Sequence, residues 1–325
     1  MTGVTRRGGP NGRPTARALG PVGVICHQFG PTVAQCADFV RTAERAGADW
    51  CMLPDALGWR DLWMTLTAAA TATERISIGP GVTNPYTRHP FVTLSALATL
   101  DEISGGRAFL GVAAGGSELP VLAGFDRRDA PERVRDLVDA VRRAAAGDPP
   151  IPLLPPIGSV PIVGGARGRR MLEAVGDVCD LALLWDQTFG ELSRAAAVVR
   201  ERRAAIAWSP LRAVDGDGVR AAVVYGVLNS RAPVRRDLGV DPSREASIRE
   251  VLEARGMEAA AALIPDAVME SFLAPEDPSA AAAAGRELGA SVIAVQGFDL
   301  DSLPDRVAWA HEVGKRLADR AAEEL

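Results

Sequence analysis

The sequence has little of what membrane proteins, metalloproteins and disulfide-bonded proteins need. Its 325 residues include four cysteines, three histidines and a single lysine, Lys315. No run of about 18 apolar residues occurs, so no membrane-spanning helix is expected. The cysteines lie scattered in apolar segments without metal-ligand spacing: Cys26, Cys36, Cys51 and Cys179. We therefore expect buried free thiols in a reducing compartment, a cytoplasmic location and no metal.

Charge and known motifs exclude further classes. A formal net charge of -5 disfavours a nucleic-acid partner. The chain lacks a Walker loop, an HExxH motif and the residue order of a Ser-His-Asp triad, so hydrolase and zinc-enzyme hypotheses have no support. Residues 1–20 contain arginines and glycines but no apolar core, so we predict a disordered leader and not a signal peptide. Residues 21–325 are predicted to form one domain.

Short apolar runs alternate with helical segments along the chain, which is typical of buried parallel strands and their crossover helices. The predicted strands are 22–26, 50–53, 76–78, 108–112, 161–163, 181–185, 222–228 and 292–295. The predicted helices are 32–46, 61–73, 90–104, 131–146, 167–175, 191–205, 243–255 and 303–320. This order predicts a (β/α)8 barrel, with a doubly wound sheet as the alternative. An insertion between strands seven and eight, 229–277, is the candidate lid.

In such a barrel, catalytic residues lie where the strands end. His27 follows the first strand and could act as a general acid or base, although a packed core histidine fits the sequence equally well. Asp55 follows the second strand and could bind a ligand or cap a loop. The small and backbone-rich segments at the other strand ends suit a cofactor that brings its own chemistry.

A glycine-rich loop joins the fifth strand to the next helix. Its residues are Gly164, Gly165, Ala166, Arg167 and Gly168. Glycines at a helix start let backbone N–H groups approach a phosphate closely. A tight turn that needs positive φ is the alternative explanation for the same residues.

Three segments resemble the bacterial luciferase-like oxidoreductases: TNPYTRHP at 83–90, LDEISGGRAFLG at 100–111 and PIVGGARGRRMLEAVGDVCDLALLW at 161–185. The resemblance covers about 22–296 and points to the deazaflavin-dependent branch that includes methylenetetrahydromethanopterin reductase. It implies a (β/α)8 barrel with coenzyme F420, or alternatively FMN, in the barrel mouth.

The resemblance also implies roles for particular residues. A non-prolyl cis peptide between Gly81 and Val82 would support the back face of the flavin-like ring, and Asp55 matches an acidic residue of relatives. The remaining implied cofactor contacts are Thr83, Asn84, Gly115, Gly116, Ser117, the loop from Gly164 to Gly168, and Trp185.

Two residues depart from the pattern of relatives. Ala56 stands where many relatives have histidine after the aspartate, and Gly116 where an acidic residue is common. Either His27 replaces the missing proton donor, or the reaction needs none, or catalysis is lost.

The predicted function is hydride transfer between C5 of F420 and a small organic substrate. An FMN-dependent monooxygenase that uses O2 and a partner reductase is the alternative, and a non-catalytic flavin-binding barrel is the third hypothesis. A homodimer is expected, without a nucleic-acid or membrane partner.

Overall fold

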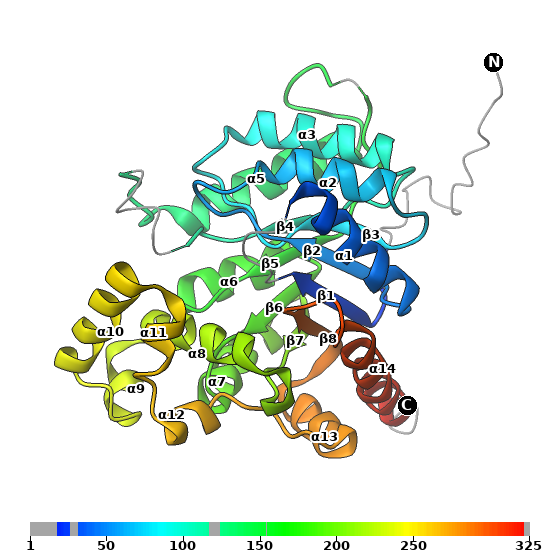
Figure 1. The fold of residues 1–325 in the computed structure, drawn as a ribbon. Coiled ribbons are helices and arrows are strands. Elements are labelled where there is room, and N and C mark those ends of the chain that lie inside the picture. Colours follow the sequence, from blue (N-terminus) through cyan, green and yellow to red (C-terminus); the bar gives the residue numbers. More distant parts are fainter. Residues whose placement is uncertain (1–17, 27–31, 117–123, 154, 322–325) are drawn as a thin grey trace.

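The computed structural model shown in Figure 1 describes residues 18–26, 32–116, 124–153 and 155–321. Eight parallel strands form one sheet in the order β3-β2-β1-β8-β7-β6-β5-β4. Parallel bridges from Ile78 to Ala108 and from Thr83 to Val112 connect β3 to β4 and close the barrel. The strands are β1 (Val22–Cys26), β2 (Trp50–Leu53), β3 (Ser77–Pro80), β4 (Leu110–Val112), β5 (Ile162–Gly165), β6 (Leu181–Trp185), β7 (Ala205–Ser209) and β8 (Ala290–Gly297). The predicted barrel is confirmed.

Helices surround the barrel, and their ends follow local sequence signals. Thr32 and Gln35 form a capping box before α1, and Pro90 occupies the first turn of α3. Gly105 and Gly106 follow α3 with φ of 67° and 87°, which ends the helix as the sequence predicts. The outer helices are α1 (Val33–Arg45), α2 (Leu62–Thr71), α3 (Pro90–Ile103), α5 (Ala130–Ala145), α6 (Arg169–Val178), α7 (Phe189–Arg200), α13 (Pro278–Leu288) and α14 (Leu303–Ala321).

The seventh strand is not where the sequence analysis placed it. Residues 222–228 lie within α8 (Asp217–Asn229), and β7 begins at Ala205, where the prediction ended a helix. The prediction was wrong because α8 is buried against both the insertion and the barrel rim, so its apolar run has no helical alternation. A short run of this kind cannot be distinguished from a buried strand by its periodicity.

The insertion after β7 is therefore longer than predicted. It contains a short 3-10 helix (Ala213–Asp215), α8, α9 (Ala232–Asp237), α10 (Pro242–Arg255), α11 (Met257–Ala261) and α12 (Asp266–Glu270). The predicted helix 243–255 is α10 of this insertion, and α13 supplies the outer helix before β8. Val223, Val227, Ile248 and Phe272 belong to a separate small core of the insertion, which lies at one side of the barrel in Figure 1.

Alternate strand positions fill the barrel interior. Trp50 and Met52 on β2 pack with Phe109, and the Trp50 and Phe109 rings meet edge to face at 5.9 Å. Leu183, Ala207 and Ala294 face the same interior from β6, β7 and β8. Because side chains alternate along a strand, the next inward positions are Trp185, Ser209 and Gln296. These three residues therefore form the uppermost layer of the interior on the β6–β8 side.

Several expectations concern single residues or absences. All four cysteines are buried, and none of them forms a disulfide bond. No helix within the described ranges is long and apolar enough to cross a membrane. Nor does the described part of the chain contain a group of three or more His, Cys, Asp or Glu residues able to hold a metal ion. His27, Ser117 and most of the predicted leader lie outside the described residues.

Candidate active site at the barrel mouth

The segment after β3 forms one wall of the barrel mouth. The Gly81–Val82 peptide bond is cis, at the position that the sequence analysis gave. Gly81 N donates to Leu53 O at 2.6 Å, and Thr83 N donates to Gly111 O at 3.0 Å. These bonds fix the segment between the ends of β2 and β4.

Glycine is required at two positions where the segments of β2, β3 and β4 approach one another closely. A Cβ on Gly111 would lie 2.0 Å from Pro80 O, and a Cβ on Gly81 would lie 2.4 Å from Met52 Cβ. Both contacts are far shorter than van der Waals distance, so the close approach of β3 to its neighbours depends on the missing side chains.

Asp55 lies at the end of β2 beside this wall. Thr83 Oγ1 donates to Asp55 Oδ2 at 2.6 Å. Burial raises the pKa of the Asp55 carboxyl, although the Thr83 bond and the charge of Arg88 act in the opposite direction. A carboxyl with a raised pKa can carry a proton closer to neutral pH than an exposed aspartate can, which suits an acid or base.

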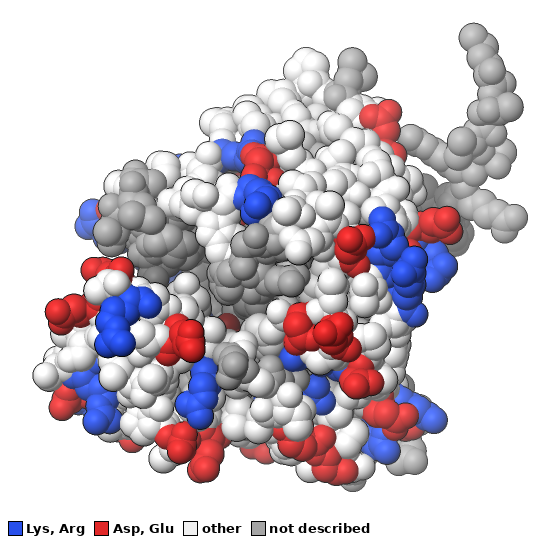
Figure 2. Space-filling model, in the orientation of Figure 1, with Lys and Arg blue, Asp and Glu red and all other residues white. Residues whose placement is uncertain are grey.

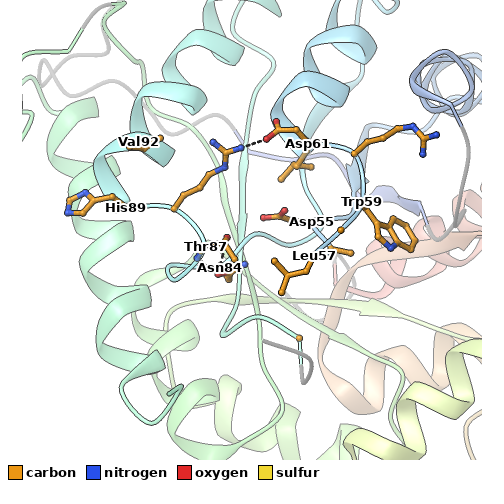
Figure 3. A pocket seen from close by; sticks show the side chains of 14 residues that line it. Asp55, Leu57, Trp59, Asp61, Asn84, Thr87, His89 and Val92 are labelled. Atoms are coloured by element: carbon orange, nitrogen blue, oxygen red, sulfur yellow. Dashed lines mark hydrogen bonds and ion pairs between the residues drawn. The ribbon is translucent and has the colours of Figure 1, made fainter. Parts of the chain in front are cut away.

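A cavity of about 520 Å3 adjoins Asp55 between the loops after β2 and β3. Figure 3 shows Asp55 near its centre, with Leu57, Asn84 and Thr87 close by. Arg88 forms an ion pair with Asp61 that links the two loops beside the cavity. Ala56 and Gly116, the two departures from the pattern of relatives, also line it. Their small size leaves this space open.

Asn84 holds the loop after β3 in shape. Its Oδ1 accepts hydrogen bonds from Tyr86 N and Thr87 N, both at 3.0 Å, and from Thr87 Oγ1 at 3.3 Å. The side chain is 3% exposed. Its carbonyl oxygen is therefore used by the protein itself, as in an Asx turn.

The glycines after β5 serve different purposes. A Cβ on Gly164 would meet Val175 Cγ1 at 2.5 Å, and one on Gly165 would meet the Trp185 ring at 2.5 Å. A Cβ on Gly168 would meet nothing within 4 Å. Gly168 is the N-cap residue before α6, with φ -80°, and no side chain caps that helix. The positive-φ alternative is therefore wrong for this residue. Backbone N–H groups at the start of α6 are the part of this loop open to an anion.

Arg167 points away from the start of α6 and toward the end of β6. Its Nη2 donates to Asp186 O at 2.7 Å. Burial lowers the pKa of this guanidinium, and the carboxylates of Asp186 and Glu191 oppose the shift. The indole of Trp185 is half-buried and lies over Gly165. The two glycines after β4 are held by Arg127. Its Nη1 donates to Gly115 O at 2.6 Å and to Gly116 O at 2.8 Å.

Three polar residues of the mouth were not among the predicted site residues. Asp186 follows β6 with φ 49°, and its Oδ1 accepts from Gln296 Nε2 at 2.7 Å. Ser209 ends β7 and is buried. Asp186 and Gln296 stand at predicted strand ends, a signal that could have identified them. Ser209 was missed because the seventh strand was misplaced.

Eight parallel strands with polar and glycine-rich segments at their carboxyl ends define an α/β-barrel enzyme with its site at the mouth. The chain belongs to the luciferase-like monooxygenase family, whose sequence model matches residues 10–293. This membership confirms the resemblance seen in the three motifs. The family is one of oxidoreductases, and the relatives described next are named as reductases and a monooxygenase.

Known proteins resemble the chain in sequence and in fold. The 5,10-methylenetetrahydromethanopterin reductase of Methanolobus tindarius is 28% identical over 275 residues, covering 75% of this chain and 84% of that protein. The 4-hydroxyprotoasukamycin monooxygenase of Streptomyces nodosus subsp. asukaensis is 32% identical over 122 residues, 32% of each chain. The coenzyme F420-dependent tetrahydromethanopterin reductase of Methanopyrus kandleri shares the fold, with a TM-score of 0.72, 22% identity and coverage of 93% and 99%.

Proposed function

We propose that this protein is a coenzyme F420-dependent oxidoreductase that transfers a hydride between C5 of the deazaflavin and a small organic substrate. The observation that carries the proposal is the wall after β3, where the Thr83–Asp55 hydrogen bond stands beside the tightly packed Gly81 and the adjoining cavity. The similarity to methylenetetrahydromethanopterin reductase over 84% of that protein supports the choice of cofactor.

The residues at the mouth fit a flavin-like group. The segment Gly81–Val82 offers a side-chain-poor surface for a flat ring, and the N–H groups at the start of α6 suit a phosphate. Gly115 and Gly116 line the path between them with backbone alone. The bound deazaflavin would supply the hydride chemistry. The barrel would orient the two reactants and exclude water.

Asp55 is the residue proposed to hold or deliver a proton. Its Oδ2 accepts a hydrogen bond from the Thr83 hydroxyl, and the residue lines the adjoining cavity. Thr83 fixes the orientation of the carboxyl, and burial favours its protonated form. Asp55 therefore takes the role of the missing histidine at position 56, where this chain has alanine.

An FMN-dependent monooxygenase is the second candidate. The family name and the similarity to 4-hydroxyprotoasukamycin monooxygenase favour it. Such an enzyme would consume O2 and depend on a separate reductase for reduced flavin. Oxygen uptake with reduced FMN distinguishes it from an enzyme that transfers hydride only to an organic acceptor.

Titration with oxidised F420 and, in parallel, with FMN tests the proposal through quenching of tryptophan fluorescence. We expect micromolar binding of F420 and weaker binding of FMN. Preference for FMN would favour the monooxygenase, and binding of neither would leave a barrel without this cofactor chemistry.

Gly168→Asp sharpens this titration. A carboxylate at this position would cap α6 and occupy its free N–H groups, so the helix should be slightly more stable while a phosphate is repelled. We expect cofactor affinity to fall at least tenfold. Pro265→Asp is the matched control, because Pro265 precedes α12 without a side-chain cap and the charge change is the same. It should leave the affinity unchanged.

We also propose that the protein is a homodimer joined through α2 and α3. Over ten residues α2 has no charged side chain, and α3 has only Asp101 and Glu102 near its end. Met64 is 73% exposed and Val92 51% exposed on these helices. Figure 2 shows a largely uncharged surface over this part of the molecule. An uncharged face suits a two-fold contact, because the same patch of both protomers is buried and like charges would be brought together.

Sedimentation velocity at micromolar concentration tests the dimer. Met64→Glu should shift the protein to monomer, because a charge would be buried in the proposed interface without a partner. Val214→Glu changes another exposed apolar residue, 68% exposed and outside α2 and α3, and should leave the dimer intact. A monomeric wild-type protein would contradict the proposal.

A further inference from the structure

Four residues at the carboxyl ends of β5 to β8 form a polar cluster, composed of Arg167, Asp186, Ser209 and Gln296. Gln296 Nε2 donates to Asp186 Oδ1 at 2.7 Å. Arg167 Nη2 donates to Asp186 O at 2.7 Å. Ser209 stands on β7, between the strands that carry Asp186 and Gln296. The polar cluster therefore spans the barrel mouth from β5 to β8.

The polar cluster has hydrogen-bonding capacity that the protein does not use. Within the described residues, Arg167 Nη1, Ser209 Oγ and Gln296 Oε1 are buried and have no hydrogen-bond partner. Ser209 is 2% exposed and Gln296 1% exposed. The bond to the Asp186 carboxylate fixes the Gln296 amide with its nitrogen toward Asp186, so the free atom is the oxygen, an acceptor. Buried polar atoms without partners destabilise a fold, which indicates a use outside folding.

The topology places the polar cluster opposite the wall after β3. In the closed barrel, β7 is the fourth strand from β3 in either direction. Alternation along β7 and β8 directs Ser209 and Gln296 inward, above Ala207 and Ala294. A ring lying against Gly81–Val82 therefore turns its open face toward the polar cluster, and whatever stacks on that face lies between them.

Charge and bonding pattern define the chemistry of that ligand. One guanidinium, Arg167, faces the carboxylates of Asp186 and Glu191, so an anion gains no net attraction. The free atoms offer donors from Arg167 and Ser209 and an acceptor from Gln296. We infer that the polar cluster binds the head of a neutral substrate in which carbonyl and N–H groups are adjacent, as in a lactam, an imide or a ureide. This inference rests on the proposed function, because it names the substrate class for the same site.

Lumazine is a suitable probe, because its fused rings can stack on a flavin-like ring and its pyrimidinedione edge presents carbonyl, N–H and carbonyl in sequence. Its fluorescence can be followed during titration of the F420-saturated protein and of the cofactor-free protein. 3-Methyllumazine keeps the shape but lacks the N–H between the two carbonyls. We expect it to bind about tenfold or more weakly, since Gln296 Oε1 then stays unpaired.

Two serine variants separate recognition from structure. Ser209→Ala should weaken lumazine binding roughly 3- to 10-fold while the Tm stays the same or rises, because the hydroxyl has no partner to lose. Ser104→Ala is the control. Ser104 is also buried, but its Oγ accepts from Arg107 N at 3.1 Å far from the mouth. This variant should lower the Tm without changing lumazine affinity.

The outcomes divide clearly. Discrimination against 3-methyllumazine by the wild-type protein, together with weaker lumazine binding by Ser209→Ala, supports the inference, in the loaded or in the cofactor-free protein. Equal binding of both probes, lumazine binding unaffected by Ser209→Ala, or a lower Tm of that variant would overturn it. Failure of the proposed function is seen separately, as absence of F420 binding in the preceding titration.

Discussion

On the β2–β4 side of the barrel mouth, the polar side chains bond to the protein itself, whereas on the β5–β8 side several do not. Thr83 donates to Asp55, and the carbonyl of Asn84 accepts three hydrogen bonds from its own loop. Ser209 and Gln296 each have a buried polar atom without a partner. The first side maintains a fixed shape and the second offers free bonding groups. This difference underlies our two proposals, that the first wall supports the ring of the cofactor and that the polar cluster recognises the substrate.

Among variants on the β2–β4 side of the barrel mouth, Gly111→Ala should have the largest effect on stability. The new Cβ would lie 2.0 Å from Pro80 O, which is backbone and cannot turn aside. We expect a loss of about 3 kcal/mol in the free energy of unfolding, measured by urea denaturation. Gly158→Ala is the control, because nothing lies within 4 Å of its Cβ position, and it should stay within about 0.5 kcal/mol of wild type. Equal stability of the two variants would show that β3 and β4 have room to separate.

Asn84→Ala should have an intermediate effect. Removing the carbonyl leaves Tyr86 N and Thr87 N without their acceptor, which should cost about 1–2 kcal/mol by the same denaturation assay. Asn84→Asp retains a carboxylate oxygen at that place and should recover most of the loss. The contrast between the two walls requires Asn84→Ala to destabilise the protein and Ser209→Ala to leave its stability unchanged. The reverse result would contradict that contrast.

Thr83→Val should have the smallest effect on stability but a distinct effect on ionisation. The Thr83 hydroxyl stabilises ionised Asp55, so its removal should raise the already raised pKa of that carboxyl further. A step that needs protonated Asp55 runs at its full rate at low pH and slows as the pH rises through this pKa. In Thr83→Val, the pH at which the rate falls should therefore be higher. Carboxyl carbon NMR of aspartate-labelled protein, with Asp55→Asn to identify the signal, measures the shift. An unchanged or lower pKa would show that the bond does not tune Asp55.

Local signals predicted much of the fold and part of the site. Pro90 and Gly105 placed the ends of α3, because helix ends depend on neighbouring residues alone. The position of the cis bond between Gly81 and Val82 came from the family resemblance. The glycine loop after β5 was only partly interpreted. Gly164 and Gly165 make room for Val175 and Trp185, which the sequence could not show, and Gly168 alone is open. Their roles differ because of contacts with residues distant along the chain.

The sequence by itself determined the barrel class, the family and the loop after β3, since strand and helix alternation and short motifs are local properties. Only the tertiary structure decided which apolar run is β7, because a buried helix and a buried strand look alike until their neighbours are known. The polar cluster likewise exists only in the closed barrel. Asp186 and Gln296 are 110 residues apart along the chain, and Arg167 is more distant still from Gln296. Barrel closure brings these side chains to one wall, where some of their polar atoms have no partner in the protein.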